Sequence, residues 1–94
     1  MIADIGQTYP LGYRAVLERA PGTSGVYAVF TSRRWVYVGE SNDIRQSLFR
    51  HLNDAPAPMH RFGPLSFSVE IAPVGERVSR QRALLAELRP ACQD

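Results

Sequence analysis

Two short runs rich in β-branched and aromatic residues, joined by a compact polar turn, constrain the fold of this chain most. Residues 25–31 (GVYAVFT) and 35–39 (WVYVG) flank the turn 32–34 (SRR). Such runs, separated by so few residues, predict an antiparallel β-hairpin. Each strand carries one tyrosine, Tyr27 or Tyr37, with a glycine two residues away. The hairpin therefore predicts a site to which both strands bring a phenol.

Helical and strand-like patterns surround the hairpin. The segment 10–20 predicts a helix from Pro10, with Leu11, Val16 and Leu17 as its apolar stripe. Ser41 or Asn42 is expected to cap a second helix, whose apolar seam is Ile44, Leu48 and Leu52. The alternation in 65–71 predicts a third strand, and 76–88 a final helix with Val78, Gln81, Leu85 and Leu88 facing inward. This order predicts an α/β (α+β) layered domain, with helices flanking a small three-stranded antiparallel sheet.

Composition limits the classes of protein to consider. The 94 residues form a single domain, 1–94, with 45% apolar and 21% charged residues, as expected of a soluble globular protein. No apolar run approaches the ~20 residues of a membrane span, and no basic-then-apolar leader begins the sequence. A single cysteine, Cys92, excludes an intrachain disulfide. We therefore expect a cytoplasmic protein that does not bind membranes.

The basic residues are all of one type. Net charge is only +2, and all eleven basic residues are arginines. Arginine binds phosphate through two parallel hydrogen bonds, which lysine cannot do, although a GC-rich genome would also produce this bias. Arg33, Arg34 and Trp35 join two cations to an aromatic ring at the hairpin turn, a combination suited to nucleic acid. The arginines of the final helix spread around it, which indicates either a solvated surface or a phosphate-contacting edge.

Taken together, the motifs over residues 24–90 resemble those of the GIY-YIG nuclease superfamily. The residues that match the family pattern are Gly25-Val26-Tyr27, Tyr37-Val38-Gly39, Ser41, His51, Leu84-Leu85, Leu88 and Pro90. The resemblance implies catalytic roles for Tyr27, Tyr37 and His51, although a helix histidine that simply hydrogen-bonds a tyrosine fits equally well. The same resemblance implies a divalent metal held by a glutamate, and an arginine that stabilises charge on the phosphate.

Two catalytic positions of the family pattern carry neutral residues here. Ser47 stands ten residues after Tyr37, where the resemblance implies the arginine, and Gln81 stands nine residues before Pro90, where it implies the glutamate. Arg50, about 60° around the helix from Ser47, is a candidate stand-in for the arginine. Glu70 is a weak candidate for the metal ligand, and His60 lies in a proline-rich loop without further ligands.

Three hypotheses about function follow. We favour a domain that has lost hydrolysis, needs no cofactor and still binds nucleic acid or another phosphate ligand through Arg33, Arg34, Trp35, Ser41 and Arg50. The first alternative is an active DNA endonuclease that uses Mg²⁺ or Mn²⁺ with a shifted set including Arg50 and Glu70. The second is a protein-interaction or regulatory module on the same scaffold.

Overall fold

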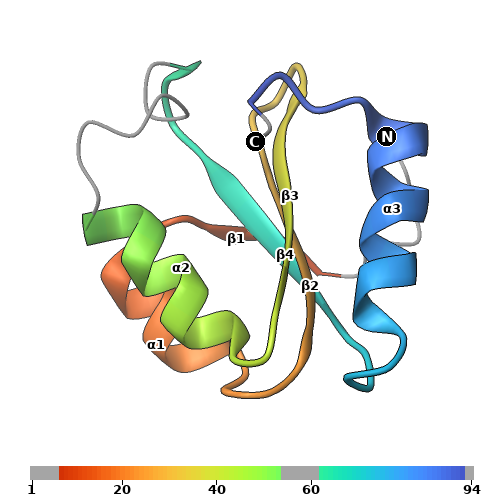
Figure 1. Ribbon diagram of the computed structural model, residues 1–94. Coiled ribbons are helices and arrows are strands. Elements are labelled where there is room, and N and C mark those ends of the chain that lie inside the picture. Colours follow the sequence, from red (N-terminus) through yellow and green to blue (C-terminus); the bar gives the residue numbers. More distant parts are fainter. Residues whose placement is uncertain (1–6, 54–61, 93–94) are drawn as a thin grey trace.

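A computed structural model describes residues 7–53 and 62–92 (Figure 1). The elements in chain order are β1 (Tyr9–Pro10), α1 (Tyr13–Arg19), β2 (Gly25–Phe30), β3 (Trp35–Ser41), α2 (Ile44–Asn53), β4 (Ser66–Ile71) and α3 (Arg77–Leu88). None of the helices in these two segments is long and apolar enough to cross a lipid bilayer.

The strands form one antiparallel sheet in the order β1-β4-β2-β3. The central strand β2 pairs with both long neighbours, so Val26 lies opposite Glu40 of β3 and opposite Glu70 of β4. Residues directly opposite each other place their side chains on the same face of a sheet. Both glutamates therefore share the face of Val26, and Tyr27 lies on the other face.

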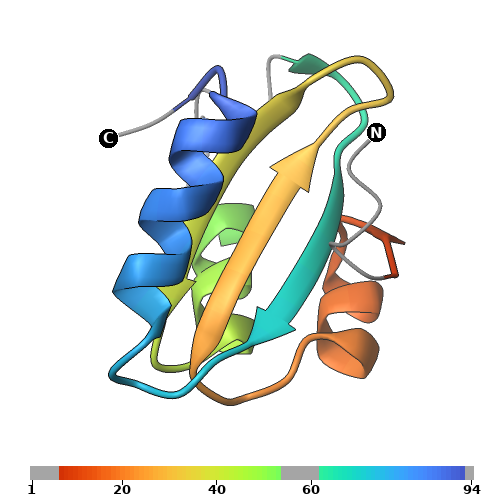
Figure 2. The ribbon, with the colours of Figure 1, turned by 90° about the vertical axis from the view of Figure 1, so that its right-hand side faces the viewer.

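The sheet is the middle of three layers. Helices α1 and α2 cover one face and α3 covers the other, lying along β3 and, less closely, β2 (Figures 1 and 2). Each face has its own apolar cluster. The cluster under α1 and α2 contains Tyr27, Val29, Val36, Ile44, Leu48 and Phe67, and the cluster under α3 contains Val26, Ala28, Val38, Leu84 and Leu88. Strand β2 thus contributes Tyr27 and Val29 to the first cluster and Val26 and Ala28 to the second.

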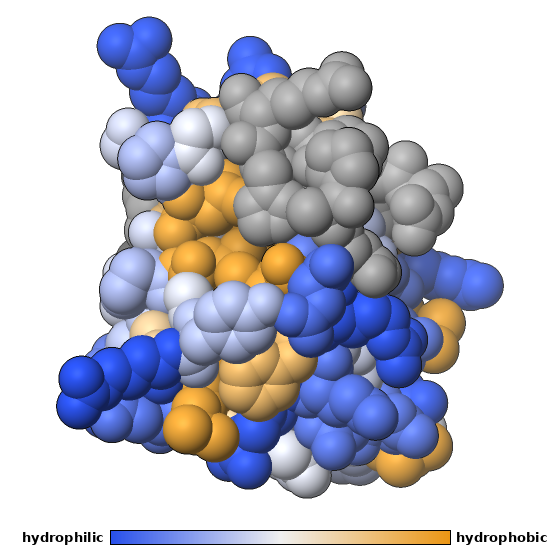
Figure 3. Space-filling view, turned by 90° about the vertical axis from the view of Figure 1, so that its left-hand side faces the viewer, coloured by the Kyte–Doolittle hydropathy of each residue, from blue (hydrophilic) through white to orange (hydrophobic). Residues whose placement is uncertain are grey.

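The outer side of α1 and α2 is not uniformly polar. Apolar side chains gather in a band on this face, next to polar ones (Figure 3). Tyr13 and Leu17 of α1 are 56% and 61% exposed, and the Tyr13 ring stacks on Phe49 of α2 with centroids 6.0 Å apart. The Tyr13 hydroxyl also donates to Oδ1 of Asn53.

Several predicted details were wrong. The sheet has four strands, because Tyr9 and Pro10 pair with Phe67 and Ser66 as a short edge strand. The first helix consequently begins at Tyr13 rather than Pro10, and Leu17 faces outward. In α3, Val78 is 43% exposed and does not face inward, whereas Leu85 and Gln81 do, together with Leu84 and Leu88.

A β-bulge changes the direction of Trp35. Val29 pairs with Tyr37, but Phe30 pairs with Trp35, so Val36 is the extra residue of β3. An extra residue reverses the alternation of side chains beyond it. Trp35 therefore packs with the cluster under α3, with its ring centroid 5.0 Å from that of Phe30, while Tyr37 faces α2.

Candidate functional site

Tyr27, Tyr37 and His51 form one aromatic cluster between the sheet and α2. The Tyr27 hydroxyl and Nε2 of His51 are 2.8 Å apart and hydrogen-bonded. The Tyr27 and Tyr37 ring centroids are 6.0 Å apart, and the Tyr37 and His51 centroids are 4.9 Å apart with their ring planes at 63°. Tyr27 is only 4% exposed, whereas the other two are half-buried. Of these three side chains, only Tyr37 and His51 therefore present appreciable surface to a ligand.

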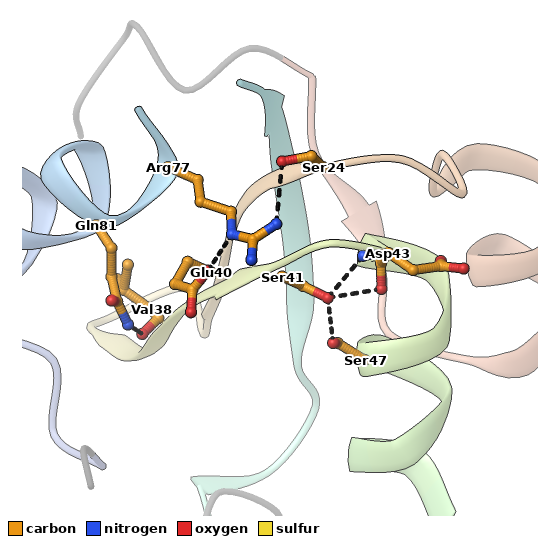
Figure 4. Close-up of polar contacts among 8 residues, drawn as sticks. All are labelled: Ser24, Val38, Glu40, Ser41, Asp43, Ser47, Arg77 and Gln81. Carbon is orange, nitrogen blue, oxygen red and sulfur yellow. Dashed lines mark hydrogen bonds and ion pairs between the residues drawn. The ribbon is translucent and has the colours of Figure 1, made fainter. Parts of the chain in front are cut away.

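Ser47, the residue at the implied arginine position, belongs to a hydrogen-bonded chain at the start of α2 (Figure 4). Its hydroxyl donates to Oγ of Ser41 at 2.6 Å. Ser41, 8% exposed, accepts from the Asp43 amide at 2.9 Å and donates to the Asp43 carbonyl at 2.8 Å. The helix cap is Asp43, whose Oδ1 accepts from the Gln46 amide at 3.0 Å, and not Ser41 or Asn42 as expected. Both serine hydroxyls are thus used within the fold.

Gln81, the residue at the implied glutamate position, faces the sheet as predicted, but on the side opposite Tyr27. Its side-chain Nε2 donates to the carbonyl of Val38 at 3.3 Å (Figure 4). A carboxylate could not donate this bond, since it only accepts when ionised. The amide therefore supports the attachment of α3 to the edge strand β3.

Glu40 and Arg77 form an ion pair beside Gln81 that the sequence did not reveal. Arg77 lies one helical turn before Gln81, and its Nε is 2.5 Å from Oε2 of Glu40. Both atoms are shielded from solvent, and their contact is an ion pair without the alignment of a hydrogen bond. Nη1 of Arg77 also donates to Oγ of Ser24 at 3.3 Å. Alternation along the strand places Glu40 on the same face of the sheet as Val38. This was the signal in the sequence that could have located Glu40.

Glu70 and Arg50 are not brought together. Glu70 lies on the face of Val26, where its Oε2 is 2.6 Å from Nε of Arg80. Arg50 is exposed on α2 and makes no ion pair with any residue of 7–53 or 62–92. His60 lies outside the described residues.

The described residues at the implied metal position do not fit a catalytic divalent cation. Mg²⁺ takes oxygen ligands and relies on carboxylates. Position 81 offers an amide whose NH₂ group is directed to Val38, and the carboxylates of Glu40 and Glu70 are each paired with an arginine of α3. Across the described part of the chain, no group of three or more His, Cys, Asp or Glu side chains is placed to hold a metal.

We expect Tyr27→Phe to lower the free energy of unfolding by about 1–2 kcal/mol. The substitution leaves a half-buried His51 nitrogen without this hydrogen bond, and losing one partner of such a bond has a cost of this size. Urea denaturation followed by circular dichroism measures the change. Tyr9→Phe is the control, because its hydroxyl bonds the exposed side chain of Gln7. Equal stability of the two variants would contradict a structural role for the Tyr27–His51 bond.

Comparison with known proteins supplies a structural likeness. No family model matches the sequence, and no curated protein matches it significantly. The GIY-YIG N-terminal endonuclease domain of UvrC from Thermotoga maritima bound to magnesium superposes with a TM-score of 0.69 at 21% identity, over 97% of each chain. One point mutant of that domain, bound to its catalytic divalent cation, gives 0.69 at 20% identity over 97% of each chain. A second gives 0.67 at 22%, over 97% of this chain and 96% of that one. Superposition over nearly the whole chain shows that this protein has the GIY-YIG fold.

Proposed function

We propose that this protein is a GIY-YIG-like domain that has lost hydrolysis and binds nucleic acid. The observation that carries the proposal is the use of Gln81 and Ser47 in contacts within the fold. Gln81 donates to the Val38 carbonyl, and Ser47 donates to Ser41. Neither position supplies the charge that the family pattern implies.

Loss of those charges has a direct chemical consequence. Phosphodiester hydrolysis by the means that the family pattern implies uses a Lewis acid at the phosphate and a cation near the developing negative charge. The cations Arg77 and Arg80 are committed to Glu40 and Glu70 on the sheet face opposite the tyrosines. The side chains of Tyr27, Tyr37 and His51 remain, but neither an arginine at position 47 nor a glutamate at position 81 accompanies them.

Binding is supported by different features. The superposed structures are endonuclease domains, and the isoelectric point of this sequence is about 9.1. Arg33, Arg34 and Arg50 are exposed, and each lacks a carboxylate partner within the described segments. Exposed guanidinium groups are suited to phosphate oxygens. We include these arginines and Trp35 in the binding surface, and assign the buried Ser41 a structural role.

Titration of the purified protein with labelled DNA or RNA tests binding. We expect the logarithm of the binding constant to fall linearly with the logarithm of the salt concentration, with a slope of about −2 to −3 for three phosphate contacts. Replacing Arg33 and Arg34 together by alanine should reduce that slope by roughly 2. Binding that is absent, or that does not respond to salt, would remove the proposal.

A plasmid assay tests the loss of hydrolysis in the same preparation. Supercoiled DNA incubated with the protein and Mg²⁺ or Mn²⁺ should remain uncut. Nicking that disappears in Tyr27→Phe would instead establish the active-endonuclease alternative. If nicking survives this substitution, the nicking activity of each purification fraction is compared with its content of this protein. The activity of a contaminating nuclease will not follow the elution of the domain.

A further inference from the structure

The β2–β3 turn is held rigidly by its own backbone and one side chain. The Thr31 hydroxyl accepts from the amides of Arg33 at 3.1 Å and Arg34 at 3.2 Å. The Thr31 amide donates to the Arg34 carbonyl at 2.9 Å. With these bonds in place, the turn presents its arginines from a defined backbone rather than from a loose loop.

Two aromatic residues, Phe30 and Trp35, help to line a hollow at this turn. The hollow measures about 210 Å³ and is lined by Phe30, Thr31, Ser32, Arg33, Arg34 and Trp35. The bulge at Val36 turns Trp35 beside Phe30, with their ring planes 58° apart. This volume is below the roughly 300–1,000 Å³ of pockets for drug-sized ligands, so it suits a single ring system.

Two arginines line the hollow, and no acidic residue is near them in the sequence. No aspartate or glutamate occurs between Glu18 and Glu40. Arg33 is exposed, and the Arg34 guanidinium lies over the Phe62 ring at 5.4 Å from its centroid, which fixes its direction. Neither arginine has an ion-pair partner in the part of the chain that the structure describes.

We infer that this hollow is a subsite for one unpaired nucleotide of a single-stranded nucleic acid, with its base against Trp35 and its phosphate on Arg33. The inference rests on the proposed function and specifies its ligand. Base stacking on an aromatic ring beside an arginine is the usual means of binding single strands. A duplex keeps its bases stacked on one another and does not offer one to such a hollow.

Trp35 is the single tryptophan of the chain, so its fluorescence reports on this subsite alone. Titration of the full chain with a single-stranded oligothymidylate should quench that fluorescence, and a duplex of equal length should quench it much less. By anisotropy with a labelled strand, Trp35→Ala should weaken binding about 5- to 150-fold, the usual range for one stacked base. If Trp35→Ala does not fold, Trp35→Phe takes its place. This variant keeps a ring for stacking and for the core, and it should retain most of the affinity.

Arg33→Ala is compared with Arg82→Ala, a matched change at an exposed arginine of α3. We expect the first to weaken single-strand binding several-fold and the second to leave it nearly unchanged. The protein could bind single strands without a change in Trp35 fluorescence and with equal affinity in Arg33→Ala and Arg82→Ala. That result would overturn the subsite but not the proposed function. Equal quenching by duplex, or by inorganic triphosphate, would overturn the role of an unpaired base. Absence of binding to every nucleic acid would overturn the proposed function as well.

Discussion

Replacing Gly25 with alanine is expected to lower the free energy of unfolding by about 3 kcal/mol or more, the upper range for overpacking. A Cβ at this position would lie 2.3 Å from the Glu70 carbonyl oxygen, 2.8 Å from Cδ1 of Ile44 and 3.1 Å from Cα of Ile71. Two of these obstacles are backbone atoms of β4, which pairs with β2 at this point. The strands would have to separate at the end where α2 begins. Since small domains have a total stability of about 5–15 kcal/mol, this loss is large.

Chemical denaturation of Gly25→Ala, followed by circular dichroism, measures the effect. Gly39→Ala is a useful second variant, because its Cβ would meet the side chain of Tyr27 rather than backbone. A ring can rotate away at a smaller cost, although it then loses its bond to His51. Gly75→Ala is the control, since no atom lies within 4 Å of its added Cβ. Equal stability of Gly25→Ala and this control would refute the close approach of the strands.

Arg77→Met is expected to destabilise the domain by about 2 kcal/mol, which is less than the 3–5 kcal/mol for breaking a fully buried pair. The side chains of Arg77 and Glu40 are 20% and 29% exposed, so solvent reduces the penalty on the unpaired carboxylate. Methionine keeps the length of the aliphatic stem, and therefore most of its packing, while removing the charge. Thermal or urea denaturation measures the change.

A double-mutant cycle separates the charge pair from packing. Glu40→Gln combined with Arg77→Met removes both charges, and we expect the double variant to recover most of the stability lost in the single one. Arg82→Met provides the matched control, because Arg82 is exposed on the same helix. Independent, additive losses in the cycle would be inconsistent with direct coupling between Glu40 and Arg77.

The charged residues of this region come from other elements than those in the family pattern. That pattern implies a cation on α2 and a carboxylate on α3, whereas here the carboxylates Glu40 and Glu70 come from strands. The cations that pair with them, Arg77 and Arg80, come from α3. Ion pairs between α3 and the sheet neutralise these carboxylates within the protein itself. The single substitution Gln81→Glu would therefore add a charge without removing the arginines next to it.

The sequence by itself determined the strands of the hairpin, the existence of all three helices and the division of β2 into two faces. Period-two and helical patterns are local properties, so residues 25–31 and the seam of Ile44 and Leu48 revealed them. The resemblance to the family implied a shared site for Tyr27 and His51, and the structure adds the bond between them.

Only the tertiary structure decided which residues occupy each side of the sheet at the site. The bulge at Val36 reverses Trp35, and strand pairing aligns Glu40 and Glu70 with Val26. The pairing of β1 with β4, the ion pairs of Arg77 and Arg80, and the contact of Gln81 with Val38 all join distant segments. No local pattern encodes such contacts, because they depend on how the helices and strands pack after they have formed.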